Sequence, residues 1–139
     1  MRDDIVDLVH RYADAVVRRD ADQWAACWAE DATWALGSGH LVRGREAIVD
    51  LWTSAMGTFE AVVQNVFNGE VHPAAGGAEG RWYIGEHFRR VGGEVGMLLA
   101  HYDDAYVRRD GRWVFASRAL VPLYQGPPDL SGHFLNGPA

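Results

Sequence analysis

The spacing of apolar residues changes near residue 58, and this change constrains the fold more than any other feature of the chain. Before it, apolar residues recur three and four positions apart, as they do in helices that bury one face. After it, apolar and polar residues alternate over four long segments, as they do in strands. The sequence therefore predicts helices followed by a sheet, which is the α+β class.

The boundaries of these elements follow from turn and capping residues. We predict helices over residues 3–19, 20–32 and 44–57, and a short strand that enters a Gly/Ser turn over residues 33–39. We predict four strands, over residues 59–72, 78–91, 94–109 and 112–124. The dipeptides Gly92-Gly93 and Asp110-Gly111 are hairpin signals, so the sheet should be largely antiparallel. Residues 125–139 should form an irregular tail.

Length and charge limit the classes of partner. The 139 residues suggest one domain, with a core over about residues 3–124. A net charge of −6 argues against nucleic acid and against anionic membrane surfaces as partners. The single cysteine, Cys27, can form no disulfide within the chain. The N-terminus is too charged for a signal peptide and no apolar run approaches a membrane span, so we expect a cytoplasmic protein.

The strand over residues 94–109 carries polar groups on both of its faces. Because side chains alternate, Tyr102, Asp104 and Tyr106 share one face, and His101 and Asp103 share the other. The chain also has six Trp, five Tyr and five Phe residues, which can line either a core or an apolar ligand pocket.

Several motifs together resemble the SnoaL-like domains of the nuclear transport factor 2-like superfamily. They are "RYADAVVRRDADQW", "WAEDATW", "GREAI" and "YDDAYVRRDGRW", and the resemblance covers about residues 3–124. It implies a cone-shaped, curved, mostly antiparallel sheet wrapped around the N-terminal helices. It also implies chemistry without a cofactor, and a homodimer built on the outer face of the sheet. The superfamily includes scytalone dehydratases, lindane dehydrochlorinases, ketosteroid isomerases, polyketide cyclases, subunits of larger enzymes and binding modules, so the fold alone does not give the function.

The resemblance also implies which face of each strand points into the cone. On the third strand this is the face of Tyr102, Asp104 and Tyr106. On the neighbouring strands the inward residues would be Trp82, Ile84 and Glu86, and Val114, Ala116, Arg118 and Leu120.

An inward Asp104 has two interpretations. A carboxyl group in an aromatic cone is desolvated, which raises its pKa and suits it to act as a general acid or base. Alternatively, Asp104 forms a structural ion pair with Arg118 on the next strand. Arg118 would then only neutralise Asp104, whereas in the first interpretation it would anchor an anionic part of the ligand. Tyr102 and Tyr106 are candidate donors to an oxyanion, or packed core residues.

The resemblance includes a catalytic His–Asp pair, and this chain departs from that pattern. Gln64 stands where the family keeps a general-base histidine, four residues before Asn68. A glutamine amide cannot act as a base near neutral pH, but Gln64 and Asn68 can orient a ligand. Asp20 matches the family's active-site aspartate, and it is also a candidate helix N-cap.

Four more residues are candidates for the wall of the pocket, namely Tyr12, Trp34, Trp82 and Glu86, where Glu86 would be a second pocket acid. No spacing of His, Cys, Asp and Glu indicates a metal site, and we expect no cofactor.

These residues favour a small cofactor-independent enzyme of the dehydratase, isomerase or cyclase type. It would act by acid–base chemistry on a cyclic, largely apolar metabolite, with Asp104, Tyr102, Tyr106 and Asp20 as its catalytic residues. Two alternatives remain open. One is a non-catalytic small-molecule-binding domain, and the other is an accessory subunit of a larger enzyme.

Overall fold

The computed structural model describes residues 1–137, which form three helices and seven strands. In chain order the elements are α1 (Arg2–Arg18), α2 (Ala21–Ala26), β1 (Trp28–Ala35), β2 (Leu41–Arg43), α3 (Arg45–Met56), β3 (Phe59–Ala74), β4 (Gly77–Arg90), β5 (Val95–Arg109), β6 (Arg112–Gly126) and β7 (His133–Phe134).

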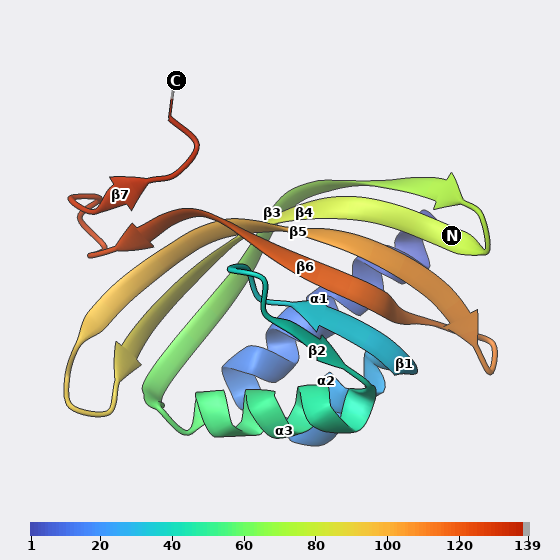
Figure 1. Cartoon of the computed structure of the whole chain (residues 1–139), viewed down its shortest axis with the longest axis horizontal. Coiled ribbons are helices and arrows are strands. Elements are labelled where there is room, and N and C mark those ends of the chain that lie inside the picture. Colours follow the sequence, from blue (N-terminus) through green and yellow to red (C-terminus); the bar gives the residue numbers. More distant parts are fainter. Residues whose placement is uncertain (138–139) are drawn as a thin grey trace.

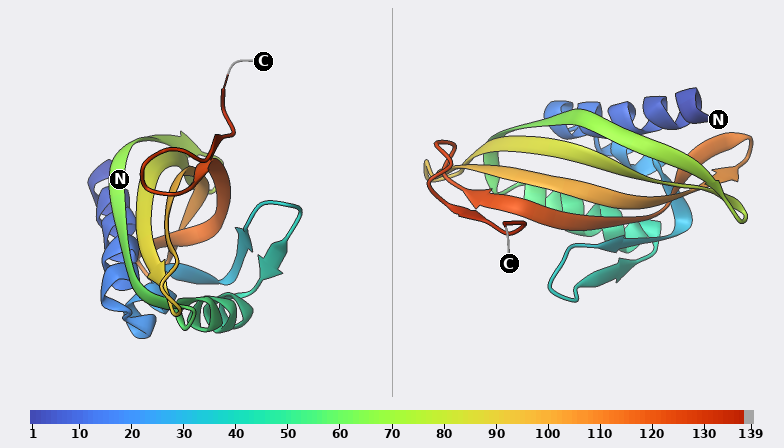
Figure 2. Two further views of the ribbon diagram at one scale, coloured as in Figure 1. Left: turned by 90° about the vertical axis from the view of Figure 1, so that its left-hand side faces the viewer. Right: turned by 90° about the horizontal axis from the view of Figure 1, so that it is seen from above.

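The strands form one curved sheet in the order β2-β1-β6-β5-β4-β3, and β7 pairs with β6. The four long strands are antiparallel neighbours, whereas β1 runs parallel to β6. They form an arch with the three helices beneath it (Figure 1). Seen along the arch, the sheet bends through most of a circle, with α1 beside β3 and α3 across the open side (Figure 2). The predicted α+β class and the curved, cone-like sheet are confirmed.

Helix α1 supplies much of the core under the arch. Its fully buried side chains, Ile5, Leu8 and Tyr12, recur at helical spacing. The helix ends at Arg19, whose backbone is left-handed (φ 56°). No helix within residues 1–137 is long and apolar enough to cross a membrane.

The predicted helix over residues 20–32 is wrong beyond residue 26. Asp20 caps α2 as expected, but α2 ends at Ala26, and from Trp28 onward the chain pairs with β6. The amide of Phe115 donates a hydrogen bond to the Cys27 carbonyl at 2.8 Å, which starts this pairing. The pairing with a strand almost 90 residues later overrides the helical spacing of Trp24 and Trp28.

The four predicted long strands are confirmed as β3 to β6. The prediction of an irregular tail is wrong in part, because β6 continues to Gly126 and residues 133–134 pair with it as β7. The buried Tyr124 holds this return, since its hydroxyl accepts a hydrogen bond from the Gly132 amide at 3.0 Å. Residues 138 and 139 of the predicted tail lie outside the described residues.

Candidate active site

The face of β5 that carries Tyr102, Asp104 and Tyr106 points into the arch, as predicted. All three residues are buried, at 5%, 5% and 1% exposure. The tyrosine rings contact residues of the helices and of β6, whereas Asp103 on the other face pairs with the exposed Arg81.

The prediction for β6 is wrong at Val114 and Ala116. The pairing of β5 with β6 is regular from the Asp110-Gly111 turn to the pair of Tyr106 with Phe115. The next residue of β5, Ala105, pairs with Ser117 and not with Ala116. The extra residue, Ala116, is a β-bulge, so the alternation of β6 changes phase there. Phe115 therefore points inward, and Val114 pairs with Val107 on the opposite face.

Beyond this bulge, Arg118 lies opposite Asp104 and forms a buried ion pair with it. Arg118 Nε lies 2.7 Å from Asp104 Oδ1, and Nη2 lies 3.1 Å from Oδ2. The hydroxyl of Tyr106 donates a third hydrogen bond to Oδ2 at 2.8 Å. Both carboxylate oxygens are occupied, so this geometry is that of the structural ion pair which the sequence left open as an alternative.

Aromatic rings enclose the guanidinium of Arg118. It lies 3.7 Å from the ring centre of Tyr102, 4.2 Å from Phe115 and 4.4 Å from Tyr12. Burial by itself would lower the pKa of Arg118, but Asp104 and the two phenols raise it further than burial lowers it. Arg118 is therefore charged at any physiological pH, and its charge is balanced inside the protein by Asp104 and the ring faces.

A second buried polar pair joins β3 to β4. Gln64 is 6% exposed, and its side-chain amide donates a hydrogen bond to Glu86 Oε2 at 3.0 Å. The two residues are partners in the strand register. Burial raises the pKa of Glu86, and the hydrogen bond from Gln64 opposes that rise only in part. Glu86 is thus an acid whose proton is held more tightly than in water.

Glu86 also lines a cavity of about 510 Å³ near the turn between β4 and β5. The other walls come from β4, β5, the start of β3 and the end of β6. Apolar side chains contribute to them, namely Phe59, Phe88, Val95, Met97 and Leu98, together with Gln125, Gly126 and Pro127. Arg90 and Glu94 lie at the same cavity, so its wall is partly polar. Apolar walls with a few polar groups are a common arrangement in sites for small molecules.

Two predicted phenols lie within electrostatic reach of Glu86. Burial raises the pKa of Tyr12 and of Tyr102, and Glu86 adds a smaller rise to both. The two rings pack edge to face, with centres 6.0 Å apart. Both hydroxyls therefore keep their protons at neutral pH and can donate hydrogen bonds.

The structure does not bring Asp20 and Asn68 to this group. Asp20 Oδ1 accepts a hydrogen bond from the Gln23 amide at 3.0 Å, so the aspartate acts as the N-cap of α2. Asn68 is exposed because β3 has an irregularity between Val66 and Gly69, which changes the phase of alternation after Gln64.

The two predicted tryptophans are buried at different places. Trp82 is 3% exposed and packs against Gly69, where an added Cβ would come within 2.4 Å of the indole. Trp34 belongs to an aromatic cluster that α2 and β1 form together. Its ring centre lies 5.4 Å from that of Trp24 and 6.0 Å from that of Trp28. Neither tryptophan lines the cavity beside Glu86.

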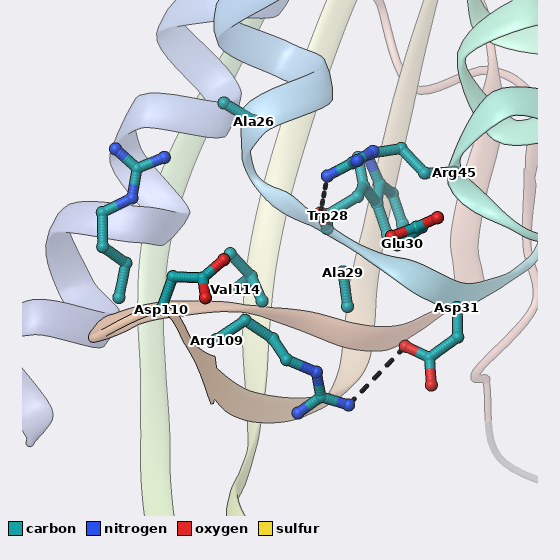
Figure 3. A pocket seen from close by; sticks show the side chains of 10 residues that line it. Ala26, Trp28, Ala29, Glu30, Asp31, Arg45, Arg109, Asp110 and Val114 are labelled. Atoms are coloured by element: carbon teal, nitrogen blue, oxygen red, sulfur yellow. Dashed lines mark hydrogen bonds and ion pairs between the residues drawn. The ribbon is translucent and has the colours of Figure 1, made fainter.

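A larger groove, of about 920 Å³, lies beside the turn between β5 and β6, and Figure 3 shows the side chains that line it. Its charged side chains are exposed and partly neutralise one another, as in the contact of 3.6 Å between Arg109 and Asp31. Arg45 donates to the Trp28 carbonyl at 3.3 Å. No carboxyl group of this groove is buried.

Sequence reasoning missed the side chains that form the cavity wall around Glu86. Phe88 and Arg90 follow Glu86 at steps of two on β4, so strand alternation alone places them on its face. Phe59 and Leu98 come from neighbouring strands, and no local signal marks them. Gly69, isolated within a strand pattern, was a signal for the irregularity that turns Asn68 outward.

Comparison with known proteins agrees with this architecture. A family model described as the SnoaL-like domain matches residues 1–119. No curated protein matches the chain significantly.

Solved structures with the same fold include LinA, with 26% identity, a TM-score of 0.83, and coverage of 99% of this chain and 94% of that one. They also include the hexachlorocyclohexane dehydrochlorinase LinA-type3 from Novosphingobium barchaimii, with 24% identity, a TM-score of 0.82 and the same coverage. A candidate scytalone dehydratase from Novosphingobium aromaticivorans has 20% identity and a TM-score of 0.86, also over 99% and 94% of the two chains. The chain belongs to the SnoaL-like domain family, with the nuclear transport factor 2-like fold.

Proposed function

We propose that this protein is a cofactor-independent enzyme that moves a proton on a small, largely apolar, cyclic molecule bound in the cavity beside Glu86. The reaction would be an elimination, an isomerisation or a cyclisation. The observation that carries the proposal is the Glu86 carboxyl group itself, which is partly buried, lines a cavity together with Phe59 and Phe88, and accepts a hydrogen bond from Gln64.

Glu86 replaces Asp104 as the acid–base group in this proposal. Asp104 has both oxygens bound to Arg118 and Tyr106. Among residues 1–137, Glu86 has one side-chain hydrogen-bond partner, the amide of Gln64 at 3.0 Å, and it lines the cavity. Burial raises the pKa of Glu86 toward neutral pH. A carboxyl group whose pKa lies near the working pH transfers protons efficiently in both directions.

Gln64 and the two phenols would have supporting roles. The Gln64 amide fixes one oxygen of Glu86 and leaves the other for substrate. Tyr12 and Tyr102 do not line the cavity, so these protonated phenols would act only through the electrostatic environment that they share with Glu86. The guanidinium of Arg118 packs against both rings and fixes their positions.

The names of similar proteins support a reaction of this type. Dehydrochlorinases and dehydratases remove a proton and a leaving group, and both occur among the structures with this fold. The catalytic histidine of the family pattern is Gln64 here, so this chain would use a carboxylate as the base.

Proton transfer can be tested before the substrate is known. A panel of cyclic ketones and β-hydroxyketones is incubated with the protein in D₂O, and deuterium incorporation beside the carbonyl is followed by NMR. We expect exchange with at least one member. Glu86→Gln should reduce that exchange by about 10²–10⁴-fold, which is the usual contribution of a general base.

The matched control is Glu94→Gln, which removes an exposed carboxylate from the same cavity. It should leave exchange within a few-fold of the native rate. Exchange that survives in Glu86→Gln, or the lack of exchange for every panel member that binds, would contradict the proposal.

The second candidate function is binding without chemistry. It is favoured by the closed network of Asp104, Arg118 and Tyr106, in which each charged group has its partner inside the protein. A panel member that binds in the cavity and shows neither exchange nor elimination would favour this alternative.

A further inference from the structure

Arg90 is the one cation that lines the cavity beside Glu86, among the described residues. It is the last residue of β4, and its side chain is 41% exposed. Arg89, its neighbour, points to the other face and pairs there with Glu60 at 2.9 Å. Strand alternation thus separates two adjacent arginines, one into the cavity and one into solvent.

Two aromatic rings hold the Arg90 side chain. Its guanidinium carbon lies 4.7 Å from the ring centre of Phe59 and 4.9 Å from that of Phe88, and both rings line the cavity. Stacking of this kind restricts the side chain while leaving the N–H groups in its plane free to donate. The guanidinium is therefore positioned before any ligand arrives.

The polar interactions of Arg90 with its neighbours are weak. Its Nε lies 3.4 Å from the carboxylate of Glu94, which is 74% exposed, and Nη1 lies 3.3 Å from the Thr58 hydroxyl. An exposed ion pair of this length contributes little. Within residues 1–137, no hydrogen bond is made by Nη2. Part of the guanidinium fork is thus available to a ligand.

Glu86, Phe88 and Arg90 follow one another on the cavity face of β4. The Cα atoms of Glu86 and Arg90 are about 13 Å apart, because a strand rises about 3.3 Å per residue. A ligand that reaches both groups has its reacting carbon near one end and its anionic group near the other. The ring of Phe88 lies between them and suits an apolar body.

We propose that the natural ligand of this cavity is an amphipathic carboxylate, with an apolar ring system along Phe88 and a carboxylate group bound by Arg90. This inference rests on the proposed function for the cavity and adds the class of substrate. A carboxylate matches the fork of a guanidinium and forms charge-assisted hydrogen bonds with it. The Cα atoms of Glu86 and Arg90 lie about 13 Å apart along the strand, so Glu86 does not face the carboxylate of a ligand that is bound at Arg90.

The test compares two probes of the same shape, biphenyl-4-carboxylate and biphenyl-4-carboxamide, by calorimetric titration of the whole chain at pH 7.5. We expect the native protein to bind the carboxylate about tenfold more tightly than the amide, which is the scale of a charge-assisted hydrogen bond. In Arg90→Gln this preference should disappear, while the affinity for the amide stays within about threefold, because the apolar contacts remain.

The matched control is Arg89→Gln, which changes the net charge equally on the other face and should keep the preference. Glu94→Gln should increase the affinity for the carboxylate, because it removes a competing anion from Arg90. Arg90→Lys keeps the charge without the fork, so it should keep only part of the preference.

The outcomes separate this inference from the proposed function. Equal binding of both probes, or a preference that survives in Arg90→Gln, overturns the carboxylate inference and leaves the cavity as a ligand site. If neither probe nor neutral biphenyl binds, the cavity is no ligand site, and both the inference and the proposed function are wrong.

Discussion

Asp104 and Arg118 form an ion pair from which solvent is excluded, with Nε 2.7 Å from Oδ1 and side chains that are 0% and 1% exposed. Both are polar residues at the centre of an aromatic core. Taking two charges out of water is expensive, and only close, fully bonded geometry offsets the cost. On this geometry we propose a structural role for Asp104 and assign the proposed chemistry to Glu86.

Replacing Asp104 by Asn should destabilise the protein strongly. The substitution leaves the Arg118 charge buried without its partner, which costs about 3–5 kcal/mol. Urea unfolding followed by tryptophan fluorescence measures this loss. The control is Asp103→Asn, one residue away on the other face, where the exposed pair with Arg81 should be worth about 0–1 kcal/mol. Equal stability of the two variants would contradict the structural role of Asp104.

Replacing Glu86 by Gln should stabilise the protein, and more so as the pH rises. Burial raises the pKa of Glu86 in the folded state, so between the unfolded and the folded pKa the native protein binds the proton more tightly. The stability that this group contributes is complete below the unfolded pKa, and it is lost as the pH rises through the folded pKa. A neutral Gln avoids that loss.

The measurement for Glu86 is the free energy of unfolding of both proteins from pH 4 to pH 8. The difference should be smallest at pH 4, should grow as the pH rises, and should level off above the folded pKa. A flat difference for Glu86→Gln would show that its carboxyl group is not perturbed by folding.

Asp20 should behave as a helix cap. Asp20→Ala removes the acceptor for the Gln23 amide and should cost about 1 kcal/mol, the usual value of an N-cap. Asp20→Asn should keep nearly all of the stability, because Asn caps helices as well as Asp does. Thermal unfolding gives the stabilities, and the deuterium-exchange assay gives the activity. If exchange is lost in Asp20→Asn while its stability is kept, Asp20 acts in catalysis as well.

The convex face of the sheet is our proposed homodimer interface. Phe67 and Val63 are 58% and 45% exposed there, and the Phe67 ring lies over Gly85, where an added Cβ would come within 2.7 Å of it. Sedimentation at micromolar concentration should give about twice the 15.4 kDa chain mass, and Phe67→Glu should give the monomer. Val91→Glu, at a position that is 69% exposed in the β4–β5 turn, is the control and should leave the dimer intact. A native protein that sediments as a monomer would rule out this interface.

The sequence by itself determined the change from helices to strands, the antiparallel pairing of the four long strands, and that Tyr102, Asp104 and Tyr106 share one face of their strand. The resemblance to the family implied that this face points inward. Periodicity and turn residues are local, and they remain readable because each long strand keeps its alternation over many residues. The resemblance likewise implied that Glu86 lies on the inward face of its strand, although the sequence analysis gave the leading role to Asp104.

The tertiary structure decided which of these residues meet. Without the bulge at Ala116, the Asp110-Gly111 turn would pair Asp104 with Ser117, and Arg118 would lie on the other face. The irregularity after Val66 turned Asn68 outward in the same way, and pairing with β6 converted the end of a predicted helix into β1. A single extra residue in a strand reverses every side chain beyond it, and its energy depends on packing across the whole sheet. Local sequence patterns therefore do not record it.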